Sequence, residues 1–172
     1  SALGGNTTAS NNTAMGYNAL GANTTGANNV AVGRLTLDAN TTASHNTAVG
    51  DSALGANTTG ANNIAIGSGA LDANTTASRN SAVGHHALTT NTEGDRNTAM
   101  GAFAMEDNTT GTNNTAIGHD ALANNTTVSN NTAIGSNAML ANTTGYDNVA
   151  VGRNALDANV GGHSNTALGE SS

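Results

Sequence analysis

Hydrophobic and polar residues alternate in a five-residue stretch, Asn46-Thr47-Ala48-Val49-Gly50, which the chain repeats throughout its length. Alternation with a period of two is typical of a β-strand, because successive side chains point to opposite faces. Asparagine, alanine and glycine would share one face, and threonine and valine the other. The recurring glycine, the paired asparagines and the β-branched residues disfavour a helix. The pattern therefore predicts a short strand in each copy.

The stretch recurs every 17 residues, and a fixed period of this length is the signature of a repeat architecture. Counted from Ala2, ten units of 17 residues leave only Ser1 and Ser172 over. Units too small to form a core stabilise one another by stacking, which predicts an all-β, parallel β-solenoid with one coil per unit. We treat residues 2–171 as one domain. Its units are 2–18, 19–35, 36–52, 53–69, 70–86, 87–103, 104–120, 121–137, 138–154 and 155–171.

Positions within a unit are numbered 1 to 17, so the predicted strand covers positions 11 to 15. Glycine at position 15 is expected to turn a corner, and the Ala-Leu pair at positions 1 and 2 to start a second strand. Asn-Thr-Thr-Gly at positions 5 to 8 would form the other corner, because asparagine tolerates a left-handed backbone. Like residues in successive coils would stack about 4.8 Å apart, the spacing of hydrogen-bonded strands.

Two columns of identical residues are candidate structural ladders. Stacked asparagines can pass amide hydrogen bonds from coil to coil, and glycine permits a tight corner. The asparagines of position 5 are Asn6, Asn23, Asn40, Asn57, Asn74, Asn91, Asn108, Asn125, Asn142 and Asn159. The glycines of position 15 are Gly16, Gly33, Gly50, Gly67, Gly84, Gly101, Gly118, Gly135, Gly152 and Gly169.

A longer period of two units runs through the first five units. Positions 8 and 9 read Ala-Ser in units one, three and five, and Gly-Ala in units two and four. Position 12 changes with them, being valine or isoleucine where position 9 is alanine. Places that change together are expected to lie close in space.

Composition explains why a partner is expected. With 2% aromatic residues and 22 glycines the interior of each coil must be thin, and burial of one or two aliphatic side chains cannot offset the ordering of 17 residues. If the small face of the strand fills the interior, the larger side chains face a neighbouring subunit; the opposite assignment, with the aliphatics inside, stays open. The expected interface residues, in a homotrimer, are Val30, Val32, Val49, Ile64, Ile66, Val83, Ile117, Ile134, Val149 and Val151.

Charge and chemistry narrow the function classes. A net charge of -7 with only four arginines gives no basic surface for nucleic acid, and no apolar run approaches the ~20 residues that span a membrane. The histidines are scattered, and His85 and His119 would stand two coils apart, about 10 Å, too far for one metal ion. We expect no enzyme, no cofactor and no obligatory metal.

Glycosylation sequons are frequent, but most coincide with the asparagine column. Eight Asn-Thr-Thr triplets begin at position 5, and Asn11, Asn113, Asn124 and Asn130 also match the sequon. Sugars wider than the ~4.8 Å rise could not decorate every coil. A structural role is therefore favoured for the triplets.

The repeat resembles two known groups of proteins. Ile64-Ala65-Ile66-Gly67 is similar to the Val-Ala-Ile-Gly stretch in the heads of trimeric autotransporter adhesins. The Asn-Thr-Thr-Gly part, at 23–26 and 108–111, resembles repeats of phage-type tail fibres and related surface proteins. The resemblance covers the whole chain and implies a left-handed β-roll that associates as a homotrimer, outside the cell or on a virion. The longer unit departs from the adhesin heads.

These observations favour a structural and interaction protein: a rigid extracellular β-solenoid acting as fibre, shaft or adhesin module, with a host-surface or glycan ligand as a candidate partner. The alternative is an ice-binding surface, since threonine fills position 6 in nine units and position 7 in eight. The complete pattern at both ends, Ala2 to Asn6 and Asn165 to Gly169, also suggests head-to-tail stacking into a filament. No nucleic-acid partner and no membrane insertion by this segment are expected.

Overall fold

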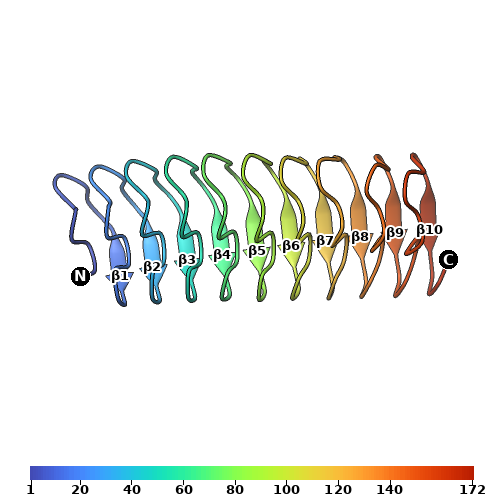
Figure 1. Ribbon diagram of the computed structural model, residues 1–172, viewed down its shortest axis with the longest axis horizontal. Coiled ribbons are helices and arrows are strands. Elements are labelled where there is room, and N and C mark those ends of the chain that lie inside the picture. The colour runs from blue at the N-terminus through green and yellow to red at the C-terminus, as the bar shows by residue number, and fades with distance from the viewer.

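A computed structural model describes residues 1–172 and shows a straight array of stacked coils, each contributing one short strand (Figure 1). The strands are β1 (Thr13–Met15), β2 (Val30–Val32), β3 (Thr47–Val49), β4 (Ile64–Ile66), β5 (Ser81–Val83), β6 (Thr98–Met100), β7 (Thr115–Ile117), β8 (Thr132–Ile134), β9 (Val149–Val151) and β10 (Thr166–Leu168). They pair in sequence order as one parallel ten-stranded sheet. The predicted all-β parallel solenoid with 17-residue coils is confirmed.

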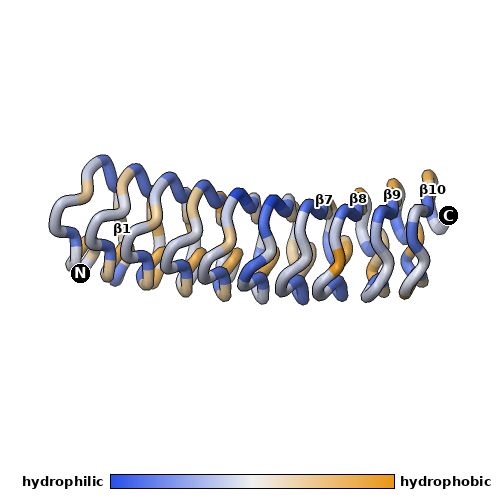
Figure 2. The backbone as a smooth tube through the Cα atoms, turned by 90° about the horizontal axis from the view of Figure 1, so that it is seen from above, coloured by the Kyte–Doolittle hydropathy of each residue, from blue (hydrophilic) through white to orange (hydrophobic).

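The register joins like positions of successive coils. Ala48 pairs with Ala65, and Val49 with Ile66, so every strand is displaced from the next by one full unit. Hydrophobic residues consequently recur at the same place in successive turns (Figure 2). The contact between two successive coils is called a seam below, and seam 4/5 joins coil 4 to coil 5.

The prediction of a second strand at positions 1 and 2 is wrong. Positions 16 to 4 form consecutive turns, and the leucine of position 2 has a left-handed backbone, with φ between 50 and 55° from Leu3 to Leu156. Positions 10 and 17 are left-handed as well, as at Asn62 and His86. Such a conformation costs a bulky residue about 1–2 kcal/mol. It is held by the buried leucine side chain and by a ladder hydrogen bond such as Leu54 N–H to the carbonyl of Ala70, 3.0 Å.

The core is a thin column of small and aliphatic side chains. It consists of alanines at positions 1 and 13 and the leucine or methionine of position 2, all buried in the central coils. Ala65 on β4 is fully buried, whereas its neighbours Ile64 and Ile66 are exposed. The small face of the strand therefore lines the interior, and the aliphatic face of the sheet points outward.

Candidate interaction surface

Two asparagine columns fix the inside of each coil. Asn57 donates from Nδ2 to Oδ1 of Asn40 (3.2 Å) and to the carbonyl of Gly60 (3.0 Å). Asn46, at position 11, donates to the same carbonyl (2.9 Å), and its Oδ1 accepts the backbone N–H of Asn63 (2.9 Å). The buried amides of these columns are thus paired on both sides, as buried polar groups require, with the single exception of Oδ1 of Asn125. The columns connect position 5, position 8 and position 11 of neighbouring coils.

The glycine column is required by both backbone angle and space. Gly67 has φ +136°, and a Cβ at this position would lie 2.3 Å from the carbonyl oxygen of Gly84. The other glycines of position 15 have similar angles, from 127 to 144°. Gly169 differs in having no atom within 4 Å of the added Cβ. Position 15 therefore excludes side chains wherever another coil follows.

The outward face of the sheet carries two rows of side chains, at positions 12 and 14. Position 14 is aliphatic in all ten strands, and Ile66 is 41% exposed and Met100 44%. Position 12 holds threonine, serine, valine or isoleucine, so neither row contains a charge. All ten residues expected at a subunit interface lie in these rows. The sheet thus presents one continuous, uncharged strip, ten strands long.

The threonine rows differ in what their hydroxyl groups do. At position 6 the hydroxyl donates to a backbone carbonyl of the next coil in every threonine from Thr7 to Thr109, as Thr58 Oγ1 does to Thr75 (3.0 Å). At position 7 the side chains are exposed from Thr8 to Thr76, without such bonds. The fold therefore uses one threonine row internally and leaves the hydroxyls of the other row facing solvent, apart from that of Thr144, which donates to the carbonyl of Val160 (3.4 Å).

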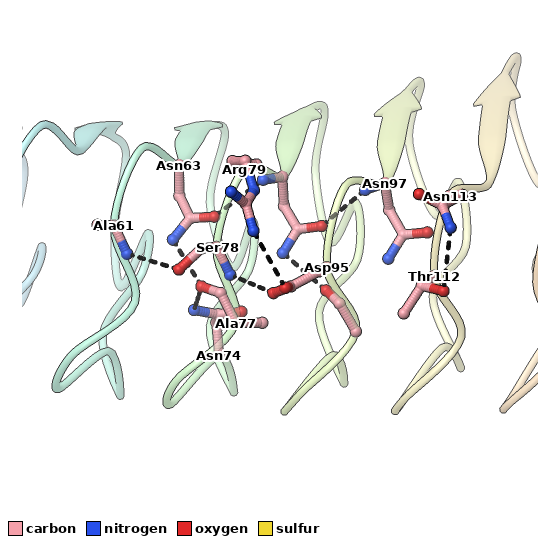
Figure 3. A network of polar contacts seen from close by, with 12 residues as sticks. Ala61, Asn63, Asn74, Ala77, Ser78, Arg79, Asp95, Asn97, Thr112 and Asn113 are labelled. Carbon is pink, nitrogen blue, oxygen red and sulfur yellow. Dashed lines mark hydrogen bonds and ion pairs between the residues drawn. The ribbon is translucent and has the colours of Figure 1, made fainter.

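Position 9 explains the two-unit period. The N–H of Ala61 donates to Ser78 Oγ (3.0 Å), and the N–H of Ser78 donates to Asp95 Oδ1 (2.7 Å) (Figure 3). Asp95 also pairs with Arg79, 3.6 Å away. The serines of coils 3, 5 and 8 thus each accept a hydrogen bond from an amide of the preceding coil, and the aspartate of coil 6 takes the same role.

Three histidines surround the only phenylalanine of the chain. The ring centroid of Phe103 lies 5.3 Å from that of His85 and 5.8 Å from that of His119. Nδ1 of His119 lies 2.9 Å from a carboxylate oxygen of Asp120. The repeat predicts that His85 and His119 stand two coils apart, but it does not predict the ring of Phe103 between them. No group of three histidine, cysteine, aspartate or glutamate side chains is placed to hold a metal ion.

Burial raises the pKa of the Asp72 carboxyl, with a further increase from Asp38 nearby; His86 acts in the opposite direction, and Asp51 adds a small increase. A Cβ on Gly55 would lie 2.7 Å from Oδ1 of Asp72. The glycine in coil 4 thus makes room for the carboxylate of coil 5. Other charges are paired across seams, as in Arg34 with Asp51 (2.7 Å) and Arg153 with Glu170.

The sequons fall into two structural groups. The asparagines of the Asn-Thr-Thr triplets are buried, apart from the half-buried Asn6. Asn11, Asn113, Asn124 and Asn130 are exposed. In the folded chain the residues of the second group are exposed, whereas in the first group only Asn6 is partly accessible to solvent.

No pocket is present on the surface of the rod. The structure also contains no helix long and apolar enough to cross a membrane. No family model, curated protein or solved structure matches this chain.

Proposed function

We propose that this chain is a rod-shaped module of an extracellular fibre, shaft or adhesin, and that copies of it associate as a homotrimer through the outward face of the sheet. The observation that carries the proposal is the aliphatic side chain at position 14 of all ten strands, on an exposed face. Contiguous apolar patches on a soluble protein mark interaction sites.

The fold of a single coil gives no reason for this aliphatic row. The interior is filled by alanine, leucine and methionine, and its polar groups, apart from Oδ1 of Asn125, are bonded within the coil and across the seams. A polar residue would serve as well on a solvated face. Cyclic symmetry would bring the same strip of each copy around one axis, and the resemblance to trimeric adhesin heads favours three copies. Exposed columns on the remaining faces, such as position 10, are then available to a host-surface or glycan ligand.

Light scattering on the purified chain tests the association. We expect three times the chain mass of 16.7 kDa. The double variant Ile66→Lys/Ile117→Lys should dissociate the trimer, because charges would be buried between subunits. The matched control, Thr59→Lys/Thr110→Lys, adds the same charges at exposed position 7 of the same two coils and should keep the parent mass. A parent chain that stays monomeric at millimolar concentration would refute the association.

An ice-binding surface is the alternative function, and it depends on the row of free threonine hydroxyls at position 7. Only this row of the two is available, because the hydroxyls of position 6 donate to the backbone. Thermal hysteresis of the parent chain and of Thr42→Ala/Thr59→Ala would decide: a signal equal to that of buffer excludes the alternative, whereas hysteresis lost in the variant would favour it.

A further inference from the structure

Seam 8/9, between coil 8 (121–137) and coil 9 (138–154), differs from the other seams on one side only. On the sheet side it is closed: Thr132 N–H donates to the carbonyl of Asn148 at 2.8 Å, and Gly152 N–H to Ile134 at 2.8 Å. At the turn that follows the sheet, Leu122 N–H donates to Ala138 at 2.9 Å. These bonds match their equivalents in the other coils.

At the Asn-Thr-Thr corner the same seam is open. In seam 7/8 the N–H of Asp107 donates to the carbonyl of Ala123 (3.0 Å) and that of Thr109 to Thr126 (2.7 Å). The corresponding N–H groups of coil 8, at Asn124 and Thr126, make no hydrogen bond within the chain. All seven preceding seams and seam 9/10 have both bonds. The N–H of Asp147, at position 10 of coil 9, likewise lacks the bond that its equivalents make.

The asparagine column breaks at the same place. Asn125 donates to Oδ1 of Asn108 (2.9 Å), and Asn159 donates to Oδ1 of Asn142 (3.1 Å). Between them Asn142 donates only to the carbonyl of Gly145. Oδ1 of Asn125 is buried and has no partner, alone among the buried side-chain atoms of the chain. An unpaired buried amide oxygen is unfavourable by about 1–3 kcal/mol.

The size of the residue at position 8 accounts for the opening. The N–H of position 6 donates to a carbonyl of the next coil. This hydrogen bond measures 2.7–3.0 Å in coils that have glycine at position 8, and 3.3–3.5 Å in coils that have alanine there. Coil 8 alone has valine, Val128, and the bond is absent. The direction of the side chain gives the reason: a Cβ added at Gly60 would lie 2.2 Å from the carbonyl oxygen of Ala77. A larger side chain at position 8 must displace the next coil.

We propose that seam 8/9 is a joint in the rod. The segment 124–130 separates from 141–147, while the pairing of β8 with β9 and the turn at Leu122 act as the hinge. The joint divides the array into a stiff segment of coils 1–8 and a second segment of coils 9 and 10, and the rod bends there over a wider range than at any other seam. The inference concerns the single chain and is independent of the proposed association.

Hydrogen exchange followed by mass spectrometry tests the opening. The N–H groups of 124–127 should exchange on the order of 100-fold faster than those of 107–110, because local opening sets exchange where the ladder is broken. Val128→Gly should restore protection in 124–127 without affecting other coils. Gly60→Val, at a glycine with no positive φ, should create the same loss of protection at 56–59. Equal exchange in the two natural segments, or an unchanged rate in Val128→Gly, would overturn the proposal.

Spin-label pairs test the bending itself, and the absence of cysteine makes the labels specific. Glu93→Cys/Thr127→Cys spans seams 6/7 and 7/8, both of which follow a glycine. Thr110→Cys/Thr144→Cys spans seams 7/8 and 8/9. Both pairs join position 7 of coils two units apart, about 10 Å along the axis. The second distance distribution should be broader and longer than the first, and should narrow in Val128→Gly. Two distributions of equal width would show that no joint exists.

Discussion

The two sides of each strand obey different rules. The inward side of β4 and its flanking residues consists of Asn63, Ala65 and Gly67. The same three residue types occupy these positions in all ten coils, and in coil 4 they are packed without free space. On the outward side, Ile64 and Ile66 are replaced elsewhere by threonine, serine, valine, methionine or leucine. The inward residues are held by hydrogen bonds and close contacts, whereas the outward residues vary in type and share only the absence of charge and, at position 14, an aliphatic side chain. The difference indicates that the inward residues specify the fold, whereas the outward residues tolerate substitution among uncharged types.

The largest effect is expected at the glycine column. Gly67→Ala should lower the free energy of unfolding by at least about 4 kcal/mol, because it combines an unfavourable φ with a Cβ 2.3 Å from a backbone oxygen. Gly169→Ala has a similar φ, +127°, and free space; it should cost only about 1–2 kcal/mol. Urea unfolding of both variants separates the two contributions. Equal losses would show that the approach of the next coil is unimportant.

The asparagine ladder comes next. Asn57→Ala removes the donor to Asn40 and Gly60 and leaves the Nδ2 of Asn74 with one of its two acceptors, the carbonyl of Ala77. About 3 kcal/mol should be lost, since buried groups become unsatisfied on both sides. Thr59→Ala, at an exposed position in the same coil, should change stability by less than about 0.5 kcal/mol. Thermal unfolding measures both, and a small effect at Asn57 would mean that water replaces the ladder.

A pair of changes within one strand tests the contrast directly. Ala65→Val should destabilise the chain by about 2 kcal/mol, because it overfills the fully buried column of alanines. Ile66→Ala should cost less than about 1 kcal/mol, because its side chain is 41% exposed. The free energy of unfolding of both variants should be measured at a concentration where the chain is monomeric. A reversed order would place the aliphatic row inside the coil.

Much of this architecture could be predicted from the sequence, because it follows from period and alternation. The strand at 47–49 and the stacking of like residues are given by the pattern of the unit. The left-handed conformation of Leu54 could not be predicted, since leucine rarely adopts it and only contacts with the next coil hold it. The opening of seam 8/9 at Val128 could not be predicted for a similar reason. The sequence shows a valine where other coils have glycine or alanine, but not that this side chain faces a carbonyl of the next coil.

The smallest expected effect concerns Asp72, a half-buried residue that lies between the packed interior and the solvent-exposed surface. Its pKa is raised in the folded chain by burial and by Asp38, so the folded state holds this proton more tightly than the unfolded state. The contribution of Asp72 to stability is therefore greatest below its unfolded pKa, about 4, and is lost as the pH rises through the folded value. Asp72→Asn should raise the melting temperature relative to the parent near pH 7 and leave it unchanged near pH 3. Asp38→Asn should give part of the same gain, because it removes the nearby charge. If the difference in melting temperature between Asp72→Asn and the parent did not vary with pH, the carboxylate of Asp72 would be solvated like the exposed carboxylates of the surface.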